Sequence, residues 1–159
     1  MGWRDQVRDQ LAGIPTFSIG RHALRCRHDV QELSLDLVGL DSLACAFERL
    51  ALSSPALAGA SVERLKKCAE TLSARITYLL EPVQPIEVDP EQCVVQLRSV
   101  PPQKDDDKTK YYELLVQRSG EISLTRYEHV AGEGRTVIPA QVTREVLSRL
   151  VEDFAAVAG

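Results

Sequence analysis

The feature that most constrains the fold is a long alternating segment that is interrupted once, at Gly120. Alternation of apolar and polar side chains with a period of two is typical of a strand that buries one face. A three-residue loop with Gly120 in the left-handed conformation sets Val116 opposite Ile122 and collects the apolar side chains on one face, whereas a two-residue turn mixes the faces. Because burial favours the first register, the sequence predicts strands at Tyr111–Gln117 and Glu121–Glu128.

The polar face of this hairpin is the best candidate for an interaction surface. It places Tyr111 across from Tyr127, and three of the four tyrosines of the chain lie in the hairpin. Tyrosine is enriched in protein interfaces because it offers a large contact area at a low cost in conformational entropy. Glu113 on the same face repels phosphate, so a protein suits the face better than RNA. We predict a partner-binding surface of Tyr111, Glu113, Leu115 and Tyr127; cross-strand tyrosine packing toward solvent is the structural alternative.

A second pair of alternating segments lies nearer the N-terminus, at residues 17–28 and 32–38, and fits a hairpin through residues 29–31. One face of its first strand carries three arginines: Arg21, Arg25 and Arg27. The hairpin would bring this row close to Glu32 and Asp36 on the neighbouring strand. The row is a weak candidate for binding an anionic ligand or an RNA backbone. Cross-strand ion pairs with the two carboxylates are the structural alternative.

The other face of the same strand holds the side chains best suited to chemistry: His22, Cys26 and His28. Divalent metals favour such ligands, and a cysteine beside a histidine can act as a nucleophile. Side chains on one face of a strand are about 6.6 Å apart or more, however, and Leu24 makes this face apolar. We therefore predict no metal site and no catalytic residue. A small enzyme with a site near His22, Cys26, His28 and Arg25 is kept as the alternative.

Helical periodicity is clearest over residues 61–79, where apolar side chains recur at steps of three and four behind the N-cap residue Ser61. A shorter helix is predicted at residues 3–12, with the single tryptophan, Trp3, docked on the body of the protein. A last helix is predicted from about Thr143, because apolar residues again recur on one side of it.

The segment after the first hairpin is ambiguous. Its apolar residues fit a helical stripe as well as an alternating strand. We predict a strand up to a break at Gly39, followed by a helix over residues 41–52. The choice between strand and helix for residues 32–40 stays open at this point.

The remaining segments complete the order of elements. Short strands are predicted around residues 86–89, 92–99 and 135–138, and the wholly polar residues 103–110 are predicted to form a solvated loop. Runs of strands and separate helices are typical of an α+β fold. The sequence therefore predicts one α+β domain over residues 1–159, with an antiparallel sheet of two hairpins or a meander and helices packed mainly on one face.

Charge argues against several classes of partner. The net charge is −4, and the acidic excess lies in residues 81–159, which hold 14 acidic and 9 basic side chains. A domain that grips a nucleic-acid backbone normally carries a basic surface, and a membrane-surface role normally requires a basic amphipathic helix. The run Asp105–Asp107 lacks the alternate spacing, central glycine and final glutamate of a calcium loop. We expect no nucleic acid, no membrane and no cofactor.

Cysteine spacing and the N-terminus indicate the compartment. The four cysteines show no C-x-x-C pair of the kind that zinc sites use, and the N-terminus lacks the apolar core of a signal peptide. We therefore expect a cytoplasmic protein with four unpaired thiols. The favoured hypothesis is a non-catalytic binding or regulatory domain that pairs with a protein partner, or with a second copy of itself in a homo-oligomer.

Overall fold

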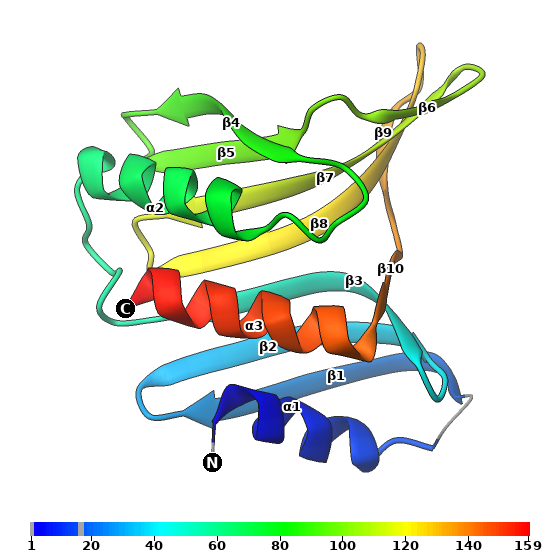
Figure 1. Ribbon diagram of the computed structural model, residues 1–159. Helices are drawn as coiled ribbons and strands as arrows, with labels where there is room; N and C mark the ends of the chain where they lie inside the picture. Colours follow the sequence, from blue (N-terminus) through cyan, green and yellow to red (C-terminus); the bar gives the residue numbers. More distant parts are fainter. Residues whose placement is uncertain (1, 16–17) are drawn as a thin grey trace.

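The computed structural model describes residues 2–15 and 18–159 and has three helices and ten strands in that part of the chain (Figure 1). The helices are α1 (Trp3–Ala12), α2 (Val62–Arg75) and α3 (Arg144–Ala158). The strands are β1 (Ser18–His28), β2 (Gln31–Leu40), β3 (Ala44–Ser53), β4 (Val83–Asp89), β5 (Val94–Ser99), β6 (Gln103–Asp105), β7 (Lys108–Gln117), β8 (Glu121–Val130), β9 (Gly134–Ile138) and β10 (Ala140–Thr143).

All ten strands belong to one antiparallel sheet. Its main path runs β1-β2-β3-β8-β7-β5-β4, while β6 pairs with β7, β9 with β8 and β10 with β3. β8 pairs with β3 through residues 121–124 and with β9 through residues 126–130, so β9 and β10 occupy the space where β3 and β8 diverge. The mixed α+β class with an antiparallel sheet is confirmed.

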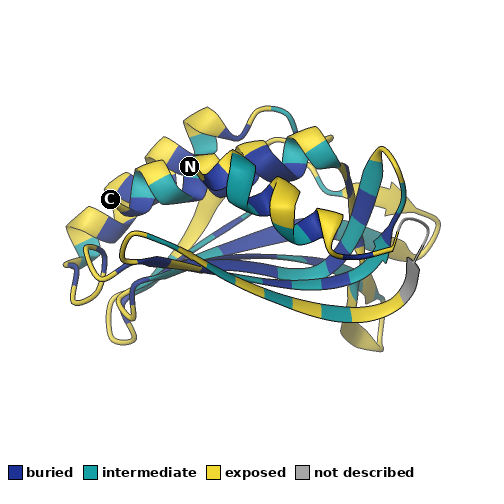
Figure 2. Ribbon diagram, turned by 90° about the horizontal axis from the view of Figure 1, so that it is seen from below, coloured by how far each residue is buried: buried dark blue, intermediate teal, exposed yellow. Residues whose placement is uncertain are grey.

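The helices and the sheet enclose a continuous apolar core. In Figures 1 and 2 the three helices lie together on one side of the sheet, with α3 between α1 and α2. Completely buried side chains come from distant parts of the chain, among them Phe47 of β3, Leu114 of β7 and Phe154 of α3. Removal of this apolar area from water is the main favourable term, at about 25 cal/mol per Å².

The three helices are fixed at identifiable residues. Ser61 Oγ and Thr143 Oγ1 each accept a hydrogen bond from a backbone N–H of the first turn, at 3.2 and 3.0 Å, so both residues are N-caps of the kind that α2 and α3 require. In α1, Trp3 is 6% exposed and its Nε1–H donates to Gln31 Oε1 of β2 at 3.1 Å. The prediction that Trp3 docks its helix on the body of the protein is confirmed.

The register predicted for the hairpin of β7 and β8 is confirmed. Val116 lies opposite Ile122, and both side chains are completely buried. Gly120 has a φ of +98°, and a Cβ atom at this position would lie 2.7 Å from the carbonyl oxygen of Ser54. Only glycine therefore satisfies both the left-handed conformation and the close approach of the neighbouring chain.

The first hairpin also forms as predicted, and it settles the open choice for residues 32–40 in favour of a strand. β1 and β2 are joined through Asp29 and Val30, and Arg27 lies directly opposite Glu32. Phe17, at the start of the predicted strand, lies outside the described residues.

The predicted helix over residues 41–52 is wrong, because most of this segment forms β3 in the middle of the sheet. The β3 side chains that enter the main core are Cys45, Phe47, Leu50 and Leu52. The pairing with β2 shifts register at Glu48, so two residues, Glu48 and Arg49, lie between the buried Phe47 and Leu50, a step of three. That step imitates a helical period, and a β-bulge is its physical cause.

Two further predictions need correction. α2 ends at Arg75 instead of residue 79, although Ile76 and Leu79 stay buried beyond its end. Residues 103–110 do not form a loop: they form β6 and the first residues of β7, joined by a tight turn. These strands are polar because no helix covers them at the tip of the sheet (Figure 1), so neither face is selected for apolar side chains.

Candidate functional site

The candidate site lies on the side of the sheet turned away from the helices. In Figure 2 none of the three helices found in the described part of the chain lies on this side, which we call the helix-free face. The pleat of β7 and β8 sends Leu114 and Val116 into the core and the alternate side chains to the helix-free face. Tyr111 and Tyr127, which lie opposite each other in the ladder, are therefore neighbours on this face.

Two tyrosines and two arginines stack in a row across β5, β7, β8 and β9. The ring centroids of Tyr111 and Tyr127 are 5.9 Å apart. The Cζ atom of Arg98 lies 4.5 Å from the Tyr111 ring centroid, and that of Arg135 lies 3.9 Å from the Tyr127 ring centroid. We call these four residues the tyrosine–arginine cluster. Each cation–π contact contributes about 0.5–1 kcal/mol or more when desolvated, so stacking holds the side chains in one arrangement.

Glu113 supports the cluster from β7, where it lies two residues after Tyr111 on the same face. Its carboxylate is buried and forms an ion pair with Arg135, which also donates a hydrogen bond to Tyr111 Oη at 3.5 Å. Burial opposes the charge of Arg135, but the hydrogen bonds to Tyr111 and Glu113 raise the pKa of Arg135 above its ordinary value. The buried carboxylate thus keeps a charged partner, which offsets the cost of its desolvation.

The four residues predicted to bind a partner lie together but differ in exposure. Tyr111 and Glu113 are each 6% exposed, whereas Leu115 and Tyr127 are half-buried. A partner on this face would contact the half-buried Leu115 and Tyr127 more readily than Tyr111, whose ring lies beneath Arg98. The partner-binding role of the four residues stays a prediction.

Exposed apolar side chains border the cluster. Val137, 48% exposed, lies directly opposite Tyr127 in the β8–β9 ladder. Ile86 and Val100, 44% and 39% exposed, line the same hollow as Tyr111. These three are half of the six large apolar side chains that are exposed in the described part of the chain. Such gathering is typical of interaction surfaces, since scattered single residues are the usual pattern.

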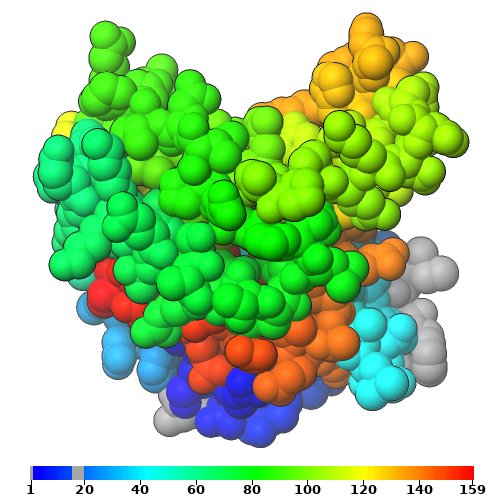
Figure 3. Space-filling model, turned by 45° about the horizontal axis from the view of Figure 1, so that its top comes forward, coloured from blue at the N-terminus to red at the C-terminus, as the bar shows by residue number. Residues whose placement is uncertain are grey.

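A hollow of about 550 Å³ lies at one side of the cluster. We call it the Arg98 hollow; its lining includes Ile86, Arg98, Val100, Thr109, Tyr111 and His129. Thr109 and His129 are paired across β7 and β8. Thr109 also pairs with Lys104 of β6, and His129 with Arg135 of β9. The β6–β7 and β8–β9 tips form the projection at the upper right of Figure 3. No aspartate or glutamate lines this hollow among the described residues.

A second hollow, of about 360 Å³, lies on the other side of the cluster and has the opposite character. We call it the acidic hollow, because its lining includes Glu87, Asp89 and Glu113, with Arg135 as its single cation among the described residues. The cluster therefore separates a hollow lined by a guanidinium and an imidazole from one lined by three carboxylates. This arrangement gives the helix-free face a charge gradient along the strands.

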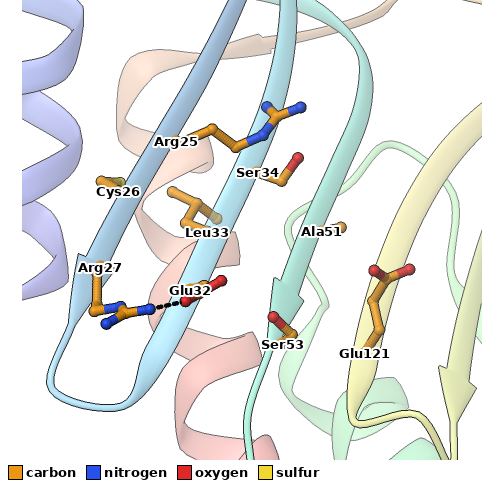
Figure 4. Close-up of a pocket in the computed structure, with 9 residues that line it drawn as sticks. All are labelled: Arg25, Cys26, Arg27, Glu32, Leu33, Ser34, Ala51, Ser53 and Glu121. Carbon is orange, nitrogen blue, oxygen red and sulfur yellow. Dashed lines mark hydrogen bonds and ion pairs between the residues drawn. The ribbon is translucent and has the colours of Figure 1, made fainter.

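The arginine row predicted as a weak anion site lies at the other end of the same face. Arg21 pairs with Glu48 at 2.7 Å, Arg25 with Asp36 at 3.7 Å, and Arg27 with Glu32. Figure 4 shows Arg25 and Arg27 beside a hollow of about 450 Å³ that Glu32 and Glu121 also line. Arg25 and Arg27 therefore pair with the two carboxylates that the structural alternative named, whereas Arg21 pairs with Glu48 of β3 instead. Anion binding by the row stays a prediction.

Of the residues of the enzyme alternative, Arg25 and Cys26 line one hollow, but the two histidines are not brought to it. Cys26 lines the hollow of Figure 4, His22 lines a separate hollow of about 180 Å³, and the ring of His28 packs edge-on against Trp3 at 5.6 Å. Burial raises the pKa of the Cys26 thiol, which disfavours the thiolate that a nucleophile needs. Within the described residues, no group of three His, Cys, Asp or Glu side chains is arranged to hold a metal ion.

Arg98 and Arg135 are the site residues that sequence reasoning missed. Parity places Arg98 on the polar face of its predicted strand, opposite to Val95 and Leu97. Its contact with Tyr111 depends on β5 pairing with β7 across the polar hairpin between them. Strand order of this kind has no local signal in the sequence, so the cluster was visible only as its two tyrosines.

Comparison with known proteins returns no relative. No protein-family model, no curated protein and no solved structure matches the chain. Among the described residues, no helix has both the length and the apolar character needed to span a membrane.

Proposed function

We propose that this protein is a non-catalytic binding domain that receives a protein partner on its helix-free face, centred on the tyrosine–arginine cluster. The single observation that carries the proposal is the stacked row of Arg98, Tyr111, Tyr127 and Arg135 next to exposed apolar side chains. Tyrosine and arginine dominate the residues whose truncation costs most in measured interfaces.

Rigidity supports the proposal. Side chains that are free in solution lose about 0.5–1.5 kcal/mol each when an interface immobilises them. In the cluster, stacking and the ion pair between Arg135 and Glu113 already restrain the long side chains. A partner would therefore gain contact area at a reduced entropic cost.

The surroundings indicate the chemistry of the partner. Ile86, Val100 and Val137 expose apolar area to water, and covering that area with apolar side chains of another chain is favourable. We therefore assign the face to a different protein with an apolar contact surface. Self-association of this chain through the same face is an alternative that the experiment distinguishes.

Site-specific photo-crosslinking tests the proposal. We expect a benzophenone side chain in place of Val137 to capture one protein in cells, and the same group in place of Val30 to capture none. Val30 is a matched control, because it is 65% exposed and lies in the turn between β1 and β2. The captured protein is then purified, and its affinity is measured for the wild type and for Tyr127→Ala.

We expect Tyr127→Ala to weaken binding of the purified partner about tenfold or more, as loss of an interface tyrosine does. A Val30→Ser variant should bind as the wild type does. Equal affinity of Tyr127→Ala and wild type would overturn the proposal. Crosslinks of the chain to itself at Val137, with a doubled mass in solution, would instead assign the face to a homodimer.

A further inference from the structure

The Arg98 guanidinium differs from the other arginines of the helix-free face in having no carboxylate. Its cross-strand neighbour is Glu113, but Glu113 pairs with Arg135. None of the ion pairs or hydrogen bonds found among the described residues involves the Arg98 side chain, and its buried Nε–H has no acceptor. By contrast, Arg21, Arg25 and Arg27 each have an acidic partner.

The position of Arg98 is nevertheless well defined. Its guanidinium lies over the Tyr111 ring, which is itself buried beneath it. Because Nε is enclosed, the two terminal Nη groups are the donors that remain for a ligand in the hollow. Guanidinium groups match carboxylates through two parallel hydrogen bonds, and stacking on an aromatic ring orients them for that purpose.

The lining of the Arg98 hollow favours an anion with an apolar group attached. His129 supplies a second polar group with an N–H donor, and Thr109 supplies a hydroxyl. Ile86 and Val100 provide apolar walls, and both are substantially exposed. No acidic side chain among the described residues lines the hollow, in contrast to the acidic hollow on the other side of the cluster.

We propose that the Arg98 hollow binds a carboxylate joined to an apolar group, with the carboxylate on the Arg98 Nη groups and the apolar group against Ile86 and Val100. This inference rests on the proposed function in one respect: the carboxylate is assigned to the partner protein, as a chain terminus or as an acidic side chain next to an apolar residue. The volume of about 550 Å³ admits one such residue.

The test uses a minimal probe and needs no partner protein. N-acetyl-L-leucine carries the carboxylate and the apolar group, and N-acetyl-L-leucinamide is its neutral match. Each is titrated into the ¹⁵N-labelled full chain, with the signals of residues around the hollow followed by NMR. We expect saturable shifts at Thr109 and His129 with the acid, and an affinity at least tenfold weaker with the amide.

Variants assign the effect to Arg98. We expect Arg98→Gln to abolish the difference between acid and amide, and Arg25→Gln to leave it unchanged. Arg25 is a matched control, because it is an arginine of the same face that already pairs with Asp36. If Arg98→Gln alters the fold, Val100→Ser provides a second arm: it should weaken binding of N-acetyl-L-leucine about threefold or more while the response to acetate stays as in the wild type.

The outcomes separate this inference from the proposed function. Equal shifts with acid and amide, or acid binding by Arg98→Gln as tight as by the wild type, would overturn the carboxylate site. The crosslinking result at Val137, and with it the proposed partner-binding face, would be unaffected in that case. Carboxylate binding without any crosslinked protein would conversely retain the site and overturn its assignment to a protein partner.

Discussion

Gly120 is the residue at which the hairpin of β7 and β8 comes closest to the rest of the chain. Its φ is +98°, and an added Cβ would meet the Ser54 carbonyl oxygen at 2.7 Å and the Ala58 nitrogen at 3.2 Å. We expect Gly120→Ala to lower the free energy of unfolding by about 2–4 kcal/mol, from backbone strain and the clash together. Urea denaturation followed by circular dichroism measures this loss.

Gly132→Ala is the matched control for that prediction. Gly132 also has a positive φ, +81°, but nothing lies within 4 Å of an added Cβ. Its alanine variant should lose only the strain energy, about 1 kcal/mol. Equal losses in the two variants would show that the close approach of the Ser54 carbonyl oxygen to an added Cβ at position 120 adds nothing to the strain energy.

Cys45 makes the stability depend on pH in the alkaline range. It is 3% exposed, and burial raises the pKa of its thiol from 9.0 to about 12. Between these values the folded chain keeps the proton while the unfolded chain loses it, so the free energy of unfolding falls as pH rises from 9 to about 12. At pH 10.5 the loss from this group is about 2 kcal/mol.

Urea denaturation at pH 8 and at pH 10.5 measures this dependence. Burial also raises the pKa of Tyr78 and of Tyr112, so other groups contribute in the same direction. Cys45→Ala should therefore keep part of the loss between the two pH values but not the share of the thiol. A variant that loses as much stability as the wild type would contradict the assignment to Cys45.

At the scale of elements, the connection after α2 is tied to the sheet by a buried ion pair. Glu81 and Arg126 of β8 approach to 3.2 Å, with side chains 10% and 9% exposed. Arg126 also stacks on Tyr112 at 4.4 Å and donates to Gln103 Oε1 at 3.0 Å. Removing the carboxylate would leave the buried Arg126 charge without its ion-pair partner, with only the neutral Gln103 oxygen and the Tyr112 ring against it.

We therefore expect Glu81→Leu to cost about 3–5 kcal/mol in the free energy of unfolding. The comparison is Glu32→Leu, which removes the exposed partner of Arg27 and should cost less than about 1 kcal/mol. Chemical denaturation of both variants at one pH checks the difference. Similar small losses in both would mean that Arg126 finds another acceptor.

The elements that sequence reasoning predicts correctly are those whose local pattern agrees with their place in the fold. In β7 and β8 one face is buried along the stretch around Leu114 and Val116, so alternation is uninterrupted and the register follows from it. In β3 the bulge at Glu48 breaks the alternation, and the alanine, leucine and glutamate content of the segment favours a helix. Pairing with β2, β8 and β10 overrides that preference.

At the scale of the whole molecule, the order of strands determines which side chains meet. The two tyrosines of the cluster follow from one local hairpin. Arg98 and Arg135 join them only because β5 pairs with β7, and β9 with β8. The Arg98 hollow depends on the same arrangement, since its lining comes from β4, β5, β7, β8 and the connection that follows β5. Part of the candidate site was therefore predictable, and the part that requires long-range pairing was not.

The prediction of a single domain requires that the whole chain unfolds as one unit, because the helices and the sheet share one apolar core. Phe154 of α3 is completely buried in the core that also contains Trp3. We expect Phe154→Ala to lower the free energy of unfolding by about 3–5 kcal/mol. The tryptophan fluorescence transition and the far-UV circular dichroism transition should shift equally.

The two signals report on different parts of the chain. Fluorescence reports on α1, because Trp3 is the only tryptophan. Glu152→Ala, which removes an exposed partner of Arg4, should shift both transitions by less than about 1 kcal/mol. A fluorescence transition at lower urea than the dichroism transition would mean that α1 separates before the sheet unfolds, and that the core is not one cooperative unit.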